Sequence, residues 1–149
     1  NMGNTKLLKK TLFLLVASIF LSSCKPNPVN FVGSWVGLSG KGSDAKLVYY
    51  IVTSLGNESY SVKREFRYLE FDDRIGKLQW RISNPRYKAA YYDKRNGVIV
   101  AGDITLELSL LGSDLTDQSG MQLTILSYGT ESVLMNAAEQ SYIEALKHN

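Results

Sequence analysis

The chain has 149 residues, of which 44% are hydrophobic and 21% are charged, a balance typical of one globular domain. Its single cysteine excludes an intramolecular disulfide and a CxxC metal site, and its single histidine, the penultimate His148, argues against most zinc sites and against Ser-His-Asp or Cys-His catalysis. Three of the 17 basic residues precede Lys25, and the rest equal the 14 acidic residues in number, so we expect no nucleic-acid partner.

The first segment has the pattern of a signal peptide for export. Lys6, Lys9 and Lys10 form a basic region, and residues 12–21 form a nearly unbroken apolar run. This run is too short to cross a bilayer as a stable helix. We therefore predict a signal peptide over residues 1–23.

The sequence Leu21-Ser22-Ser23-Cys24 closely resembles the lipobox of bacterial lipoproteins. The resemblance implies cleavage before the cysteine, a diacylglycerol on its sulfur and a fatty acid such as palmitate on the new amino group. Several acyl chains anchor a protein stably where one would be marginal. The resemblance thus implies a membrane partner through Cys24 and a place in the cell envelope. Lys25 stands where an aspartate retains enteric lipoproteins in the inner membrane, which favours the periplasmic face of the outer membrane.

Two other interpretations of this segment stay open. An ordinary signal peptidase would leave Cys24 incidental, and an uncut apolar run would be a short membrane anchor. In the lipoprotein interpretation, residues 24–30 comprise the lipidated cysteine and a tether that Pro26 and Pro28 keep extended. The remaining residues, 31–149, are predicted to form a single β-rich domain.

Short β-type segments alternate with turns through most of this domain. The alternating sequence ITLELSLL at 104–111 is typical of a half-buried antiparallel strand, and Asn96-Gly97 marks a hairpin. The spacing predicts a mainly β fold, an antiparallel meander of about eight strands closed into a barrel, with a β-sandwich or an open sheet as the alternative. The strands are expected at 32–38, 46–53, 59–71, 75–83, 86–92, 97–101, 103–111 and 121–127.

The C-terminal segment has helical periodicity. Leu134, Ala138 and Tyr142 recur at a spacing of four residues and form one apolar stripe. We expect a C-terminal helix over 131–147, capped by Thr130, that plugs or flanks the sheet.

The tripeptide Gly33-Ser34-Trp35 stands at the start of the first expected strand. A Gly-x-Trp at this place resembles the signature of the lipocalin superfamily. The resemblance implies an eight-stranded up-and-down barrel that Trp35 closes at one end, with Gly33 allowing a close turn at its base. It also implies a small apolar or amphipathic ligand.

Aromatic side chains and one arginine are the candidates for binding such a ligand. Arg64 falls on the same strand face as two of the tyrosines, and an arginine on an inward face needs a partner. That partner is either a ligand carboxylate or phosphate, bound in a bidentate contact, or a nearby glutamate, Glu65 or Glu70. Tyrosine also simply suits half-buried strands. The candidate residues are Arg64, Tyr60, Tyr68, Trp80 and Tyr91.

Two hypotheses for the function follow, and neither is an enzyme, because the sequence contains no catalytic constellation and implies no cofactor or metal. In the first, a membrane-anchored lipocalin-like domain binds a small apolar or amphipathic ligand in a cavity. In the second, a packed domain acts through its outer surface as an inhibitor, an immunity protein or an envelope-assembly factor, using Tyr50, Tyr92 or the basic strand at 63–67.

Overall fold

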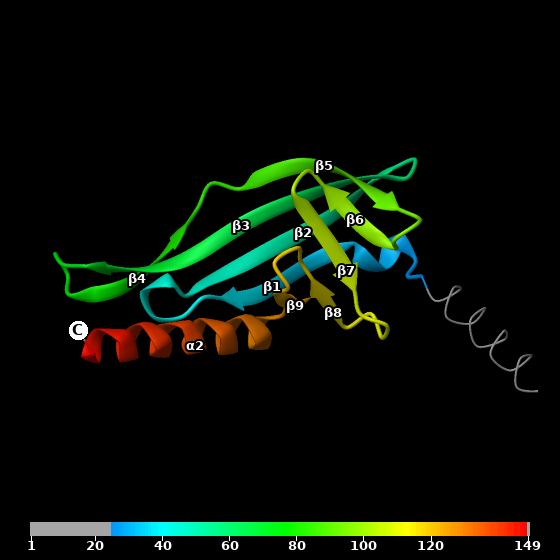
Figure 1. The fold of residues 1–149 in the computed structure, drawn as a ribbon. Coiled ribbons are helices and arrows are strands. Elements are labelled where there is room, and N and C mark those ends of the chain that lie inside the picture. Colours follow the sequence, from blue (N-terminus) through cyan, green and yellow to red (C-terminus); the bar gives the residue numbers. More distant parts are fainter. Residues whose placement is uncertain (1–24, 149) are drawn as a thin grey trace, which may run out of the picture.

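The computed structural model describes residues 25–148, so the predicted signal peptide and Cys24 lie outside the described range. Within this range a short 3-10 helix, η1 (Pro28–Phe31), is followed by nine strands and then by the helix α2 (Tyr128–Lys147) (Figure 1). A second 3-10 turn, η2 (Gly42–Asp44), joins the first two strands. The strands are β1 (Gly33–Ser39), β2 (Lys46–Gly56), β3 (Ser59–Asp72), β4 (Lys77–Ile82), β5 (Arg86–Asp93), β6 (Val98–Ala101), β7 (Ile104–Leu108), β8 (Asp114–Thr116) and β9 (Gln122–Ile125).

Eight of the strands close into an antiparallel barrel, which confirms the predicted fold class and rules out the sandwich and the open sheet. From β5 to β9 each strand pairs with the next, and the ring continues through β1, β2 and β3 back to β5. β4 lies outside this ring. It pairs with residues 67–72 of β3, whereas β5 pairs with residues 59–64. β3 is therefore long enough for its first half to form part of the barrel and for its second half to form a protruding arm with β4.

Three elements differ from the sequence prediction: the strand expected over 103–111 ends at Leu108, and β8 and α2 also differ. No strand was expected where β8 lies, because three residues are too few to show a period and turn-forming residues flank them. Its Leu115 is nevertheless fully buried in the barrel. α2 begins at Tyr128 rather than at residue 131, because Ser127 and not Thr130 is its N-cap: the Ser127 Oγ accepts a hydrogen bond from the Thr130 N–H at 3.2 Å.

Side chains fill the inside of the barrel. Trp35 is 0% exposed, and its indole N–H donates a hydrogen bond to the Phe31 carbonyl at 3.0 Å. This bond holds η1 against the first strand. The backbone φ of Gly33 is 144°, a value that other residues rarely adopt. The rest of this core includes Tyr50, Val52, Tyr60, Val62, Ile99, Ile104, Leu106, Leu115 and Leu123.

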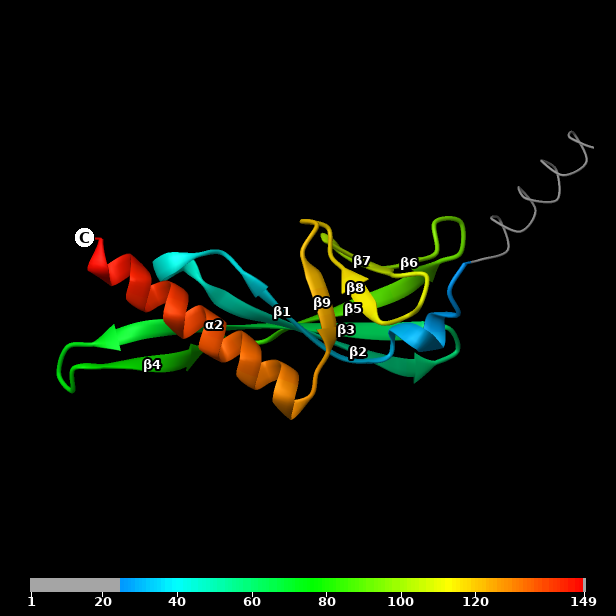
Figure 2. The ribbon, with the colours of Figure 1, turned by 90° about the horizontal axis from the view of Figure 1, so that it is seen from below.

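A second apolar core lies between α2 and the outer face of the sheet. Figure 2 shows α2 lying along the sheet in the view from below. The predicted stripe of Leu134, Ala138 and Tyr142 packs into this core. Trp80 of β4 also belongs to this core, and its indole N–H donates to Glu139 of the helix at 2.9 Å. The helix thus flanks the sheet and does not plug the barrel.

Tyr49 offers a test of this second core. It is buried, and the Arg67 guanidinium lies over its ring, 4.4 Å from the ring centroid. Burial raises the pKa of Tyr49 to about 12 from an ordinary value of 10.0. The folded state therefore holds this phenolic proton more tightly than the unfolded state does.

The stabilisation from Tyr49 is fully present below pH 10 and is lost as the pH rises towards the folded pKa of about 12. Urea unfolding at a series of alkaline pH values should show the free energy of unfolding falling across this window. We expect a shallower fall in Tyr49→Phe. The exposed Tyr128 supplies the matched control, because Tyr128→Phe should keep the wild-type slope. An equal pH dependence of the free energy of unfolding in all three proteins would contradict the raised pKa of Tyr49.

Candidate functional site at the barrel mouth

Residues 25–31 cover one end of the barrel, in place of the extended tether expected from the sequence. The Asn27 side chain accepts a hydrogen bond from the Val29 N–H at 3.1 Å and caps η1. The Tyr92 hydroxyl donates to the Pro26 carbonyl at 2.7 Å, and the Lys25 ammonium donates to the Lys94 carbonyl at 2.9 Å. We call this the entry end of the barrel.

The opposite end of the barrel, which we call the mouth, contains a hollow of about 230 Å³. Residues of β1, β2, β3 and the β8–β9 turn line it, and the β6–β7 turn brings Asp103 close to Arg64. The β5–β6 and β7–β8 turns lie at the entry end (Figure 1). The hollow combines cationic, hydroxyl and apolar groups. Its lining includes Lys46, Tyr50, Arg64, Phe66, Asp117 and Met121.

Arg64 is the central charged residue of the mouth. The pairing of β3 with β2 and β5 places it on the inner face, with Tyr60 and Phe66, as the alternation of the sequence predicts. Its side chain is only 13% exposed, and its Nη2 lies 3.8 Å from Asp103 Oδ2, too far for a hydrogen bond. Its Nε is buried and has no hydrogen-bond partner among the described residues. This guanidinium therefore has donors to offer.

Neither of the glutamates proposed as alternative partners pairs with Arg64. Glu65 lies on the other face of β3 and pairs with Arg67 at 3.2 Å. Glu70 pairs with Arg81 at 2.8 Å on the protruding arm. The observed partner, Asp103, lies in the β6–β7 turn, and only the closure of the barrel brings it to β3.

Other cations surround Arg64. Lys46 shares the Phe66 ring with Arg64: its ammonium lies 4.7 Å, and the Arg64 guanidinium carbon 5.5 Å, from the ring centroid. Lys88 donates a hydrogen bond to Asp103, and this contact holds the pKa of Asp103 below its ordinary value. Asp103 is thus shared between Arg64 and Lys88, which leaves the mouth with a cationic surplus.

Asp117 is the second carboxylate of the mouth, and both of its oxygens accept hydrogen bonds from other groups of the protein. Its Oδ2 accepts a hydrogen bond from the Tyr50 hydroxyl at 2.9 Å, and its Oδ1 accepts from the Ser119 hydroxyl at 2.6 Å and from the Met121 N–H at 3.1 Å. Burial raises the pKa of Tyr50, so its hydroxyl remains a donor. Sequence reasoning missed Asp117, because Tyr50 is 67 residues away and only a turn signal surrounds the aspartate.

Of the five predicted ligand-binding residues, the structure places only Arg64 in the lining of this hollow. Tyr60 is buried in the barrel core, and Tyr68 is half-exposed on the arm half of β3, where it pairs with Lys46 and with Arg81 of β4. Trp80 lies under α2. Tyr91 is exposed on the outside of the barrel.

Among residues 25–148 no group of three or more histidine, cysteine, aspartate or glutamate side chains is arranged to hold a metal ion. The same part of the chain contains no helix with the length and hydropathy needed to span a bilayer. Comparison with protein-family models, with curated proteins and with solved structures found no match to this chain. Its function is therefore inferred from the geometry of the barrel mouth and from the N-terminal sequence.

Proposed function

We propose that this protein is a cell-envelope lipoprotein, anchored through an acylated Cys24, whose barrel binds a small amphipathic molecule without chemical conversion. The observation that carries the binding role is Arg64: a largely buried guanidinium at the edge of a hollow, with an Nε that has no acceptor among residues 25–148. A carboxylate or phosphate on the ligand would supply that acceptor in a charge-assisted contact.

The packing of the barrel decides where such a ligand lies. Trp35 and Tyr50 are fully buried and fill the interior, so the ligand occupies the mouth and does not enter a deep cavity. Its anionic group faces Arg64 and Lys46, and its apolar part lies on Phe66 and Met121, which pack partly buried at the edge of the core. About 230 Å³ of space suits a head group and the first part of a chain.

The binding role is tested with dodecyl phosphate as a defined amphipathic anion and dodecanol as its neutral counterpart. Arg64→Gln should weaken dodecyl phosphate binding by about 10- to 100-fold, because one hydrogen bond to a charged group contributes about 1.5–3 kcal/mol. Dodecanol binding should be weaker and unaffected by the substitution. Isothermal titration calorimetry measures both.

Arg81→Gln is the matched control, since it removes the same charge from the arm, where Arg81 already pairs with Glu70 at 2.8 Å. It should leave dodecyl phosphate binding unchanged. Equal losses in the two variants would show only a general effect of net charge. Unchanged binding in Arg64→Gln would remove the arginine from the proposal.

The anchor is tested by the fate of Cys24. Radiolabelled palmitate should enter the wild-type protein and should not enter Cys24→Ser, whose product should leave the membrane fraction or accumulate uncut. The mass of the mature N-terminus separates the two alternatives, because an ordinary signal peptidase would give an unacylated cut chain and a membrane anchor would keep residues 1–23. Density-gradient separation of the membranes tests the proposed outer-membrane location.

One observation favours a second candidate function, an interaction protein acting through its outer surface. Tyr87 and Tyr91 on the outer face of β5 are 68% and 58% exposed, and the Lys63 ammonium lies 5.7 Å from the Tyr87 ring centroid. Tyr50 and Tyr92, the tyrosines expected on such a surface, instead pack in the core. A photo-crosslinker at Tyr91 that captures one envelope protein, while dodecyl phosphate fails to bind, would favour this function.

A further inference from the structure

Two adjacent leucines protrude from the β7–β8 turn. Leu110 and Leu111 are 91% and 92% exposed, the largest exposures of any leucine in the described chain. Single exposed leucines are ordinary, but two neighbours at the tip of a turn form a small apolar prominence. The turn itself is ordered: the Gly112 N–H donates to the Ser109 carbonyl at 2.9 Å, and the Ser109 N–H donates to the Asp114 carbonyl at 2.9 Å. The backbone therefore holds both leucines outward.

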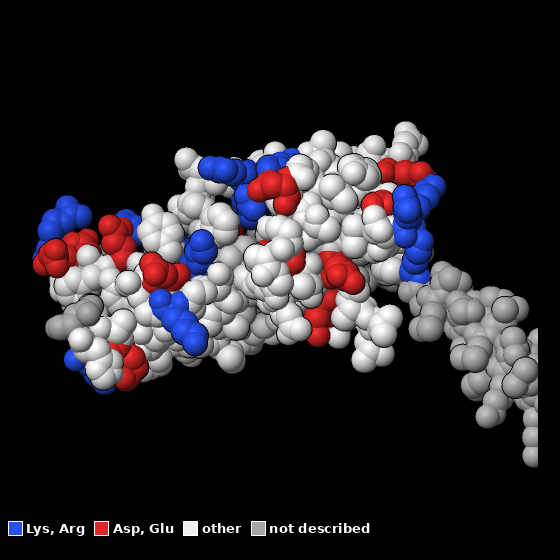
Figure 3. All heavy atoms as spheres, in the orientation of Figure 1, with Lys and Arg blue, Asp and Glu red and all other residues white. Residues whose placement is uncertain are grey.

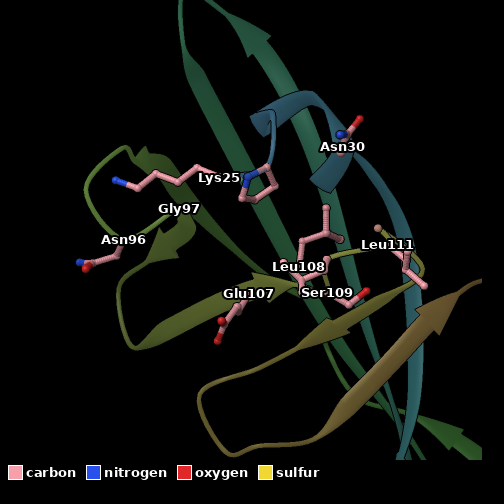
Figure 4. A pocket seen from close by; sticks show the side chains of 11 residues that line it. Lys25, Asn30, Asn96, Gly97, Glu107, Leu108, Ser109 and Leu111 are labelled. Atoms are coloured by element: carbon pink, nitrogen blue, oxygen red, sulfur yellow. The ribbon is translucent and has the colours of Figure 1, made fainter. Parts of the chain in front are cut away.

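This turn lies at the entry end of the barrel, beside the first described residues. A hollow of about 400 Å³ separates it from them, with Lys25 and Pro26 on one side and Leu108 and Leu111 on the other (Figure 4). Lys25 directly follows Cys24 in the sequence. Because a residue spans at most about 3.6 Å, a lipid on Cys24 would hold this end of the barrel within a short distance of the bilayer.

We propose that the Leu110–Leu111 turn inserts into the lipid surface to which the chain is anchored. The location rests on the proposed lipid anchor, and the apolar contact is an additional interaction. Removing leucine side chains from water is favourable, so partial insertion of two can hold the domain in one orientation. The anchor supplies the proximity, and the turn supplies the orientation.

The charges at the entry end indicate an apolar rather than an electrostatic contact. Lysine and arginine stand next to aspartate and glutamate there, so neither sign prevails (Figure 3). Lys94 pairs with Glu58 at 3.6 Å, and Glu107 lines the same hollow as Lys25. A strongly anionic lipid surface is therefore not required, and high salt should not disrupt the contact.

Insertion at this end would determine which way the mouth faces. Strands β5 and β7 end at the entry end, and the β6–β7 turn that carries Asp103 lies at the other end. The hollow at Arg64 would then open away from the bilayer, towards the aqueous side.

The experiment uses the acylated full chain in phosphatidylcholine vesicles. Because the Cys24 sulfur is blocked by lipid, Ser113→Cys provides a unique thiol in the leucine turn for an environment-sensitive fluorophore. Asp73→Cys, in the β3–β4 turn on the arm, is the matched control. We expect a blue-shifted emission and quenching by bromolipids at position 113 only, unchanged at about 1 M salt, where the Debye length is about 3 Å.

Leu110→Ser with Leu111→Ser should abolish the blue shift at position 113 while the protein still floats with the vesicles. Flotation without any shift in the wild-type leucine background would overturn the insertion and leave the anchor intact. Loss of flotation together with absent palmitate would instead refute the anchor. A blue shift that grows with protein concentration in the absence of vesicles would show that the turn contacts a second copy of the chain and not a lipid surface.

Discussion

Replacing Trp35 by alanine should lower the free energy of unfolding by about 3–5 kcal/mol, the range for deleting a large aromatic side chain from a packed core. Trp35 is 0% exposed, and the barrel closes around it, so the surrounding strands cannot collapse into the space. The substitution also leaves the Phe31 carbonyl without the indole N–H that lies 3.0 Å away. Since small domains are stable by only about 5–15 kcal/mol, the variant should lie close to unfolding.

Urea unfolding followed by circular dichroism measures this loss, and two variants calibrate it. Trp35→Phe keeps most of the ring but not the indole N–H, so it should cost less than the alanine variant. Trp80→Ala removes a tryptophan that is only partly buried under α2, and it should also cost less. A larger loss in Trp80→Ala than in Trp35→Ala would show that the helix-covered core, and not the barrel, supplies most of the stability.

Gly37→Ala should lower the free energy of unfolding by about 3 kcal/mol, at the upper end of the range for overpacking. A Cβ at this position would lie 2.6 Å from the Gln122 carbonyl oxygen and 3.1 Å from Leu123 Cγ. The obstacle is backbone, so the substitution pushes β1 away from β9. That seam is short, with Trp35 paired to Ile125 and Val36 to Thr124, and it closes the barrel.

Gly129→Ala is the control for Gly37→Ala, because a Cβ at Gly129 meets no atom within 4 Å. Alanine has the higher helix propensity, so this variant should be unchanged or slightly more stable than wild type. Amide hydrogen exchange gives a second readout, since only Gly37→Ala should speed exchange in β1 and β9. Equal stability of the two variants would contradict the close approach of the strands at this seam.

Most strands of the barrel follow from local pattern. Alternation with a period of two depends only on neighbouring residues, so the faces of β3 and β7 could be assigned without knowing their partners. The same alternation placed Arg64 on the inner face together with Tyr60. The apolar stripe of α2 could also be predicted from local sequence. The first residue of the helix, in contrast, depended on whether Ser127 or Thr130 is the N-cap.

The composition of the mouth could not be read from local pattern. Asp103 reaches Arg64, and Asp117 reaches Tyr50, only because strands that are distant in the chain become neighbours when the ring closes. Trp80 shows the same limit in another way. It was expected among the ligand-binding residues, but β4 lies outside the ring, so Trp80 packs against α2 and not in the barrel interior.

Local periodicity and the Gly33-Ser34-Trp35 motif were thus enough to predict an eight-stranded barrel with a flanking or plugging helix, and the N-terminal residues were enough to propose a lipid anchor. Which side chains meet at the mouth, which tyrosines are exposed and where the leucine turn lies were set by strand closure. The physical reason is that a strand's two faces are encoded by its own residues, whereas the partner of each face is encoded by residues far along the chain.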